Sequence, residues 1–328
     1  MNVARRFSQD GLRPLRRFSW LVSLPLGLAL LPCTAFAWQD DPKVTIATDD
    51  PDGADYGPQF SADNQRLIFE RSPLRGGRAE AYEVPIHGGK PTRFTKDQLP
   101  VSQTRLRWSA TANRIAFTGI DGQGTISTWL MEADGTRARP AYPPDGIHTF
   151  YPSWYADGTK LIELDGDKNM LRRVDLKSGK FEPLVTTPKL LTGMASVSPD
   201  GKWIAVAAQK DAGQRYNQTH NEVWIISAEG DAHPLEVAGM QGRAPTWSPD
   251  GTRLLFESNQ GSPVPLLYAI FVADKDGSHL QRLTPFDWNA QHPVWSPDGK
   301  WIAFSARLEK AIGFGPGIVV MAAPAVRE

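Results

Sequence analysis

Short apolar stretches bounded by turn residues recur along most of the chain. Six of them read RLIFER, RIAFTG, KLIELD, WIAVAA, RLLFES and WIAFSA, and each is followed after a loop by a second run, AYEVPI, TWLMEA, LRRVDL, VWIISA, AIFVAD and GIVVMA. Runs this short, delimited by Gly, Asp and Pro, leave no room for helices of ten or more residues. They predict β-strands.

A polar corner stands before each run of the first set. It is SPDG at 198–201, 248–251 and 296–299, with the variants SADN, SATAN and YADG at 61–64, 109–113 and 155–158. In such a turn Pro fixes φ, Asp hydrogen-bonds nearby backbone and Gly accepts positive φ. We therefore interpret the motif as scaffold rather than as a site of chemistry.

The corners are regularly spaced. The residues just before them are 43 to 50 positions apart, and they are Phe60, Trp108, Trp154, Val197, Trp247 and Trp295. Because this period is typical of propeller blades, the recurring tryptophans are expected to pack between neighbouring blades. A further turn and a short outer strand (TRFT, EPLV, HPLEV, QRLT) complete four strands per repeat. The prediction is an all-β, six-bladed β-propeller with four-stranded antiparallel blades over residues 38–328.

Closure of the ring follows from counting strands. The sixth repeat ends one strand short, at GIVVMAAPAVRE, while VTIAT at 44–48 precedes the first corner without a blade of its own. We expect residues 44–48 to pair with the 317–322 strand, which would close the ring without long unpaired edges.

The repeat resembles a known family. The pattern P-x-W-S-P-D-G-(K/T)-x-(I/L)-(A/L)-F is intact at 245–256 and 293–304 and weaker at 108–117 and 194–204, and the similarity runs from Val44 to about Ala323. With these motifs the chain resembles the WD40-like, or PD40, repeat family that includes the TolB-like propellers. The resemblance implies an envelope protein as partner, held at one face of the disk. TolB carries an additional α/β domain before its propeller, for which this sequence leaves no room, so the Tol-Pal role itself is not transferred.

The first 37 residues have the pattern of a secretory signal peptide. Five arginines precede the apolar run WLVSLPLGLALL, and Ala35-Phe36-Ala37 is a small-x-small cleavage pattern, so cleavage is expected after Ala37. This predicts a periplasmic protein. An uncleaved membrane anchor is the alternative, and the choice between general secretion and twin-arginine export stays open.

Composition narrows the classes of partner. Without residues 1–37 the chain has no cysteine, since Cys33 is the only one, and it keeps 31 basic and 35 acidic side chains. A net charge of −4 argues against nucleic acid, because phosphate binding needs concentrated positive charge. No stable membrane span is expected in the mature chain.

The residues that differ between blades are the candidates for function. Those just before the inner strands, together with the loops between the second and third strands, should open around the mouth of the central channel. Mixed aromatic, basic and hydrogen-bonding side chains there suit a peptide or small ligand. The candidate surface is Tyr56, Arg105, His148, Tyr151, Arg243, Trp288, Asn289 and His292. A solvated rim without a ligand is the alternative interpretation.

Catalysis has little support in the sequence. No Gly-x-Ser-x-Gly elbow is present, the six histidines form no metal-binding pair, and Asp165, Asp167 and Asn169 start a calcium-like loop that lacks its Gly and Glu. No catalytic residue, metal ligand or cofactor is predicted. The predicted function is a non-catalytic periplasmic binding module for a protein of unknown identity. One alternative is a carbohydrate-active or other metal-dependent enzyme of lyase type, using His148 or His292 at the channel mouth. The others are a small-molecule or glycan sensor and a subunit of a larger assembly.

Overall fold

The computed structural model describes residues 44–143, 145–184, 191–209, 221–229, 235–307 and 315–325. The chain divides into two units, Met1–Ala37 and Trp38–Glu328. The predicted signal peptide and its cleavage site lie outside the described residues, so both stay predictions.

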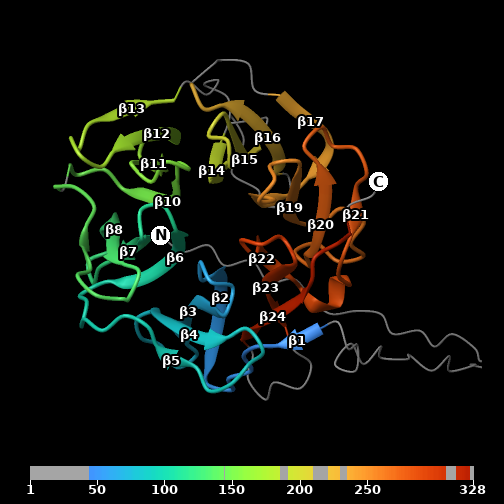
Figure 1. The fold of residues 1–328 in the computed structure, drawn as a ribbon, viewed down its shortest axis with the longest axis horizontal. Helices are drawn as coiled ribbons and strands as arrows, with labels where there is room; N and C mark the ends of the chain where they lie inside the picture. Colours follow the sequence, from blue (N-terminus) through green and yellow to red (C-terminus); the bar gives the residue numbers. More distant parts are fainter. Residues whose placement is uncertain are drawn as a thin grey trace, which may run out of the picture. The chain divides into compact units, whose positions relative to one another are not determined.

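Within the described part of the second unit, the strands form six antiparallel sheets of four strands each, so the predicted propeller is confirmed. Figure 1 looks along the ring axis, with the sheets following one another around it in chain order. Blade 1 is β2 (Gly53–Phe60), β3 (Arg66–Pro73), β4 (Glu80–Pro85) and β5 (Thr92–Arg93). Blade 2 is β6 (Ser102–Ser109), β7 (Arg114–Ile120), β8 (Ile126–Glu132) and β9 (Arg139–Pro140). Blade 3 is β10 (Thr149–Trp154), β11 (Lys160–Asp165), β12 (Met170–Asp175) and β13 (Phe181–Pro183).

The remaining blades follow the same order from the axis outward. Blade 4 is β14 (Leu191–Val197), β15 (Trp203–Gln209), β16 (Glu222–Ser227) and β17 (Leu235–Gln241). Blade 5 is β18 (Arg243–Trp247), β19 (Arg253–Ser258), β20 (Ala269–Asp274) and β21 (Gln281–Arg282), and the short 3₁₀ helix η3 (Phe286–Trp288) leads out of it. Blade 6 is β22 (Gln291–Trp295), β23 (Trp301–Arg307), β24 (Pro316–Ala322) and β1 (Val44–Ile46).

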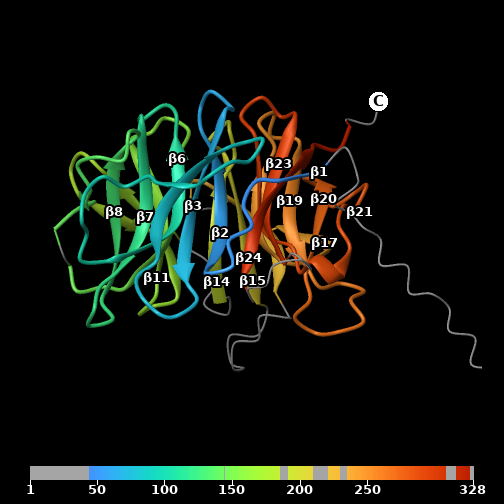
Figure 2. The same ribbon diagram turned by 90° about the horizontal axis from the view of Figure 1, so that it is seen from below.

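The ring closes as predicted. β1 pairs antiparallel with β24, with Val44 opposite Met321 and Ile46 opposite Val319. Thr48 adds a side-chain link, because its Oγ1 accepts the backbone N–H of Ile318 at 2.9 Å. The first described strand is thus the outer strand of the last blade, beside β24 in Figure 1, and Figure 2 labels both strands in the view turned by 90°.

The corners are scaffold, as predicted. At 296–299 the Ser296 hydroxyl donates to Asp298 at 2.6 Å, and Asp298 accepts the backbone N–H of Lys300 at 3.1 Å. In the corner at 198–201, the Ser198 hydroxyl and the Lys202 N–H lower the pKa of Asp200. These carboxylates are occupied by their own turns.

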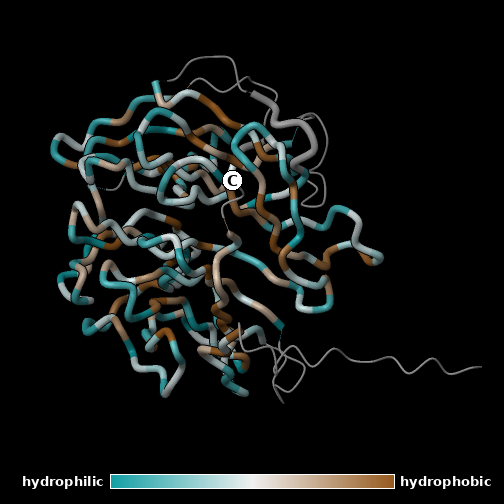
Figure 3. Tube along the Cα trace, turned by 45° about the vertical axis from the view of Figure 1, so that its right-hand side comes forward, coloured by the Kyte–Doolittle hydropathy of each residue, from teal (hydrophilic) through white to brown (hydrophobic). Residues whose placement is uncertain are grey.

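The core lies within and between the blades. Apolar stretches follow the strands and polar residues gather at many of the outer turns (Figure 3). Phe69, Phe117, Phe256 and Phe304 hold the same position in their second strands and are fully buried. The signature tryptophans join neighbouring blades, since Trp154 Nε1 donates to the carbonyl of Arg107 at 2.9 Å and Trp247 Nε1 to that of Ser196 at 3.0 Å.

Candidate functional site: the central channel

Each inner strand carries a β-bulge in which one residue has positive φ. The register shifts once in each of β2, β6, β10, β14, β18 and β22. The residues with positive φ there are Gly57, Arg105, Tyr151, Met194, Ala244 and His292, with φ between 51° and 58°. This conformation costs a residue other than glycine about 1–2 kcal/mol, and a bulge re-aims the side chain it carries.

Four of the bulges are held by the blade before them. A side chain from the second strand of that blade accepts the N–H of the bulged residue: Ser305 for Gly57 (3.2 Å), Glu70 for Arg105 (2.5 Å), Thr118 for Tyr151 (3.2 Å) and Glu257 for His292 (2.6 Å). The equivalent residues in the other two blades, Leu164 and Ala207, are apolar. The polar acceptors compensate for the ladder bonds that the bulges interrupt.

Side chains from four blades meet around His292. Arg105 Nη1 lies 2.5 Å from His292 Nε2. The ring of Tyr56 stands edge-on to the imidazole, with centroids 6.2 Å apart and an interplanar angle of 82°. The Arg105 guanidinium also lies 5.5 Å from the centre of the Tyr151 ring, a cation–π distance.

Arg243 joins the same group from a fifth blade. Its Nε lies 2.5 Å from Oε1 of Glu257, a fully buried carboxylate whose other oxygen holds the His292 N–H. The Arg243 guanidinium also lies 4.5 Å from the centre of the Tyr268 ring. Five of the eight candidate residues are therefore linked directly or through Glu257.

Burial and positive charge dominate the electrostatics of this group. Burial, then the charges of Arg105, Arg243 and Arg107, hold the pKa of His292 well below its usual value, so the imidazole is neutral at pH 7. Burial and the neighbouring Arg105 lower the pKa of Arg107 to about 10. Because the neutral imidazole faces three guanidinium groups, its surroundings favour an anion over a metal cation.

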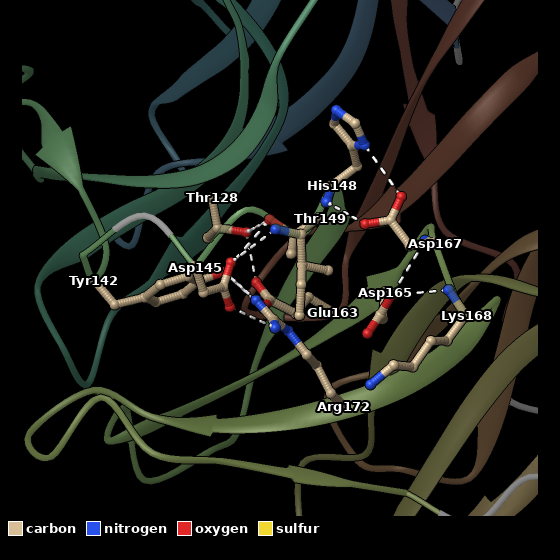
Figure 4. Close-up of polar contacts among 11 residues, drawn as sticks. Thr128, Tyr142, Asp145, His148, Thr149, Glu163, Asp165, Asp167, Lys168 and Arg172 are labelled. Atoms are coloured by element: carbon tan, nitrogen blue, oxygen red, sulfur yellow. Dashed lines mark hydrogen bonds and ion pairs between the residues drawn. The ribbon is translucent and has the colours of Figure 1, made fainter.

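The three other candidate residues are not members of this group, although Asn289 lines a cavity beside it. Asn289 caps η3 with φ 43°, and its Oδ1 accepts the N–H of Tyr268 at 3.0 Å. Trp288 is buried and stacks on Phe304, with ring centroids 6.3 Å apart, so it belongs to the core. His148 is exposed and binds Asp167 at 3.2 Å, with no contact found to the other candidates in the described part of the chain (Figure 4).

A cavity of about 230 Å³ opens beside this group. It lies where blade 6 meets blade 1, and it is lined by Tyr56, Asn289, Gln291, Ser305, Arg307 and Pro316. Its aromatic, amide, hydroxyl and guanidinium groups can contact an extended peptide or a small polar ligand.

A second charged cluster lies between blades 2 and 3. Arg172, only 2% exposed, donates through Nε to Glu163 at 2.6 Å and through Nη1 to Asp145 at 2.8 Å (Figure 4). Tyr142 donates to the same Glu163 oxygen at 2.7 Å, and burial together with the Glu163 charge raises the pKa of its hydroxyl. Glu163 occupies the position that phenylalanine holds in blades 1, 2, 5 and 6. The cluster therefore replaces part of the apolar packing in blade 3.

Sequence reasoning missed the residues that position the site. Glu70 and Glu257, which hold the bulges of the site, and Glu163 of the second cluster were not candidates, although each carboxylate directly follows two or three apolar residues of its strand. That pattern was the available signal, since a buried carboxylate requires partners.

Among the described residues no group of three or more His, Cys, Asp or Glu side chains is placed to hold a metal ion. In the same residues no helix has the length and apolar character needed to cross a bilayer.

Comparison with known proteins gives partial sequence matches. No family model matches the chain. It is 28% identical over 124 residues to an uncharacterised peptidase, YuxL, of Bacillus subtilis, and 34% identical over 120 residues to dipeptidyl-peptidase 5 of Porphyromonas gingivalis. These matches cover 36% and 35% of this chain but only 18% and 17% of the two peptidases.

Similar solved structures cover most of the chain. A TolB of Agrobacterium tumefaciens has a TM-score of 0.63 at 17% identity, over 86% of this chain and 97% of that one. The fold is that of a TolB-like propeller. An oligogalacturonate lyase in complex with manganese (TM-score 0.55, 18% identity, 86% and 93% coverage) and the calcium-binding protein regucalcin of A. tumefaciens (0.56, 14%, 84% and 92%) are similar too. TolB-like propellers therefore share their architecture with proteins of several activities, and function must be argued from the site.

Proposed function

We propose that this chain is an exported, non-catalytic binding module of the periplasm that takes a protein partner at the channel mouth. The observation that carries the proposal is the meeting of Tyr56, Arg105, Tyr151, Arg243 and His292, from five blades, beside a cavity of about 230 Å³. Tyrosine and arginine, with tryptophan, are enriched among the residues that dominate binding energy at protein interfaces.

The form of the mouth also supports a protein partner. Arg307 lines the cavity and is exposed, whereas Arg105 and His292, which line the neighbouring small cavity of the channel, are partly covered. A partner segment would thus find exposed charge at the rim and preorganised, partly desolvated groups inside, which is the usual anatomy of an interface.

The proposal that the protein is exported is supported by its first 37 residues, which have an Arg-rich start, an apolar run and an Ala-Phe-Ala sequence at their end. The likeness to TolB of A. tumefaciens is compatible with a place in the cell envelope. Osmotic-shock fractionation and N-terminal sequencing test this part. We expect the protein in the periplasmic fraction, starting at Trp38.

Site-specific crosslinking tests the partner surface. A photoreactive phenylalanine analogue replaces Arg307 at the mouth or, as a matched control, Arg66, which is exposed at the opposite end of the strands, where β3 begins. We expect one protein to be crosslinked from position 307, not from position 66, and to be lost when Tyr56→Ala is added. Equal labelling from both positions, or none, would contradict the proposal.

A further inference from the structure

Five side chains with hydrogen-bond donors line one small cavity inside the channel. Two of them, Gln59 and Thr246, donate to the carbonyls of Pro58 and Pro293, and the other three are Arg105, Arg107 and His292. Arg105 lies in the bulge of β6 and Arg107 is the first residue paired after it, and His292 reaches the cavity from β22. Its volume is about 10 Å³, which is space for roughly one atom of water size. A site this small would hold a single atom or the tip of one group.

The donors outnumber the acceptors that the protein offers them. A guanidinium cannot accept a hydrogen bond, so its contact with His292 Nε2 makes that nitrogen the acceptor and places the imidazole proton on Nδ1. Nδ1 is buried and has no hydrogen-bond partner in the described structure. The one hydrogen bond found for the Arg107 guanidinium there runs from Nη1 to the carbonyl of Leu106, at 2.9 Å.

Three other buried or largely buried arginines of this fold each pair with a buried carboxylate. Arg71 binds Asp55 at 2.7 Å, Arg172 binds Glu163 at 2.6 Å and Arg243 binds Glu257 at 2.5 Å. By contrast, neither Arg105 nor Arg107 has a carboxylate within 4.0 Å in the described part of the chain.

The local charges do not balance. Arg243 already neutralises Glu257, which leaves Glu70 as the nearby carboxylate facing the other two guanidiniums, and Glu70 uses one oxygen on the backbone N–H of Arg105. Two cations thus face one anion in a site of restricted solvent. A second negative charge there would be strongly favoured.

We propose that the channel is a binding site for one small monovalent anion, a halide ion or an oxygen of a carboxylate group, held by the guanidiniums of Arg105 and Arg107 and by the Nδ1–H of His292. The carboxylate is either that of a free acid or that of an acidic residue on a bound partner. The site shares Arg105 and His292 with the proposed partner surface, but free anions suffice to test it. If no anion binds, the crosslinking result is unaffected. If no partner is crosslinked, the anion titrations are likewise unaffected.

The test uses the full second unit, residues 38–328, in buffer without chloride at an ionic strength fixed with a bulky sulfonate salt. Formate and chloride are titrated separately, with formamide as a neutral control of the same shape as formate. We expect a saturable rise in Tm with formate or chloride and none with formamide, because a ligand that binds only the folded state stabilises it. The histidine side-chain ¹⁵N–¹H spectrum should show the Nδ1–H resonance of His292 moving along the same saturation curve.

Matched substitutions locate the site. Arg107→Gln should weaken the anion affinity by about tenfold or more, since it removes a charge-assisted hydrogen bond. Arg75→Gln removes an arginine whose side chain is 91% exposed and should leave the affinity unchanged. If Arg107→Gln does not fold, the formate–formamide comparison and the His292 resonance of the unsubstituted protein still show whether the anion binds at this site.

Two peptides distinguish the sources of the carboxylate. An acetylated, amidated Gly-Gly-Glu-Gly-Gly that binds more tightly than formate, while its Gln counterpart does not bind, assigns the site to an acidic residue of a partner. Formate or chloride binding as tightly as the Glu peptide assigns it to a free anion. No saturable response to any of the anions, or an equal response in the Arg107→Gln protein, would overturn the proposal.

Discussion

The carboxylate of Glu257 accepts the backbone N–H of His292 at 2.6 Å, across the boundary between blades 5 and 6. Its other oxygen binds Arg243 on the adjacent strand of its own blade. One buried side chain therefore fixes both the backbone that presents the imidazole and the cation beside it.

Glu257→Gln should destabilise the protein by about 3–5 kcal/mol, because it leaves the guanidinium of Arg243 without its buried counter-charge. Glu83→Gln is the matched control, since Glu83 pairs with an Arg66 side chain that is 44% exposed. Its cost should stay below about 1 kcal/mol. Urea denaturation of both variants measures the difference, and equal costs would contradict the assignment.

Arg172→Leu should cost about 3–5 kcal/mol, because it leaves the buried carboxylate of Glu163 without its counter-charge. Adding Glu163→Phe should recover at least about 2 kcal/mol, since phenylalanine fills the same position in four other blades. Free energies of unfolding for the single and double variants give the answer. A double variant as unstable as the single one would show that blade 3 cannot accept apolar packing there.

Thr48→Val should weaken ring closure by about 1–3 kcal/mol, because it removes the acceptor of the buried Ile318 N–H while keeping the shape of the side chain. Thr45→Val lies in the same closing segment and should change stability by less than about 0.5 kcal/mol. Thermal unfolding compares the two. A Thr45→Val variant as unstable as Thr48→Val would assign the loss to the strand rather than to the hydroxyl.

His292 should make stability fall as the solution becomes acidic. Its folded-state pKa is depressed by burial and by Arg105, Arg243 and Arg107. The unfolded chain therefore binds the proton first as the pH drops below about 6.5, and the free energy of unfolding should decrease by up to about 1.4 kcal/mol per pH unit. Above that pH the residue makes no contribution to the slope.

The His292→Gln protein should lose this slope between about pH 6.5 and 5. His87→Gln, which removes a histidine exposed in an outer turn, should keep it. Denaturation curves at several pH values measure all three proteins, and an unchanged slope in His292→Gln would exclude His292 as its source.

The fold could be predicted from the sequence because the turns that delimit its strands are determined by neighbouring residues. The Ser and Asp side chains of the Ser-Pro-Asp-Gly corner make their hydrogen bonds within five residues, as between Ser296 and Trp301 at 2.9 Å, so each corner marks a strand end from its own sequence. The closing strand was predictable for a related reason, since strands could be counted and one was missing.

The site was only partly readable because its geometry depends on distant residues. Arg105, Tyr151 and His292 have positive φ, which long side chains normally avoid, and nothing in their own neighbourhood in the sequence announces it. Their partners Glu70, Thr118 and Glu257 come from the preceding blade. Trp288 is the opposite case. Its position just before an inner strand suggested a place at the channel mouth, but its ring is buried and stacks on Phe304.

Closure by β1 also sets an order of events during biogenesis. The Thr48–Ile318 hydrogen bond joins residues 270 positions apart, and a chain that emerges from its N-terminus makes β1 long before β24 exists. The backbone N–H and C=O groups of Val44–Ile46 that pair with β24 then stay without that partner until almost the whole propeller has emerged. A chain halted before Pro316 has no partner strand for β1, so such fragments should be recognised as incomplete by proteases and chaperones.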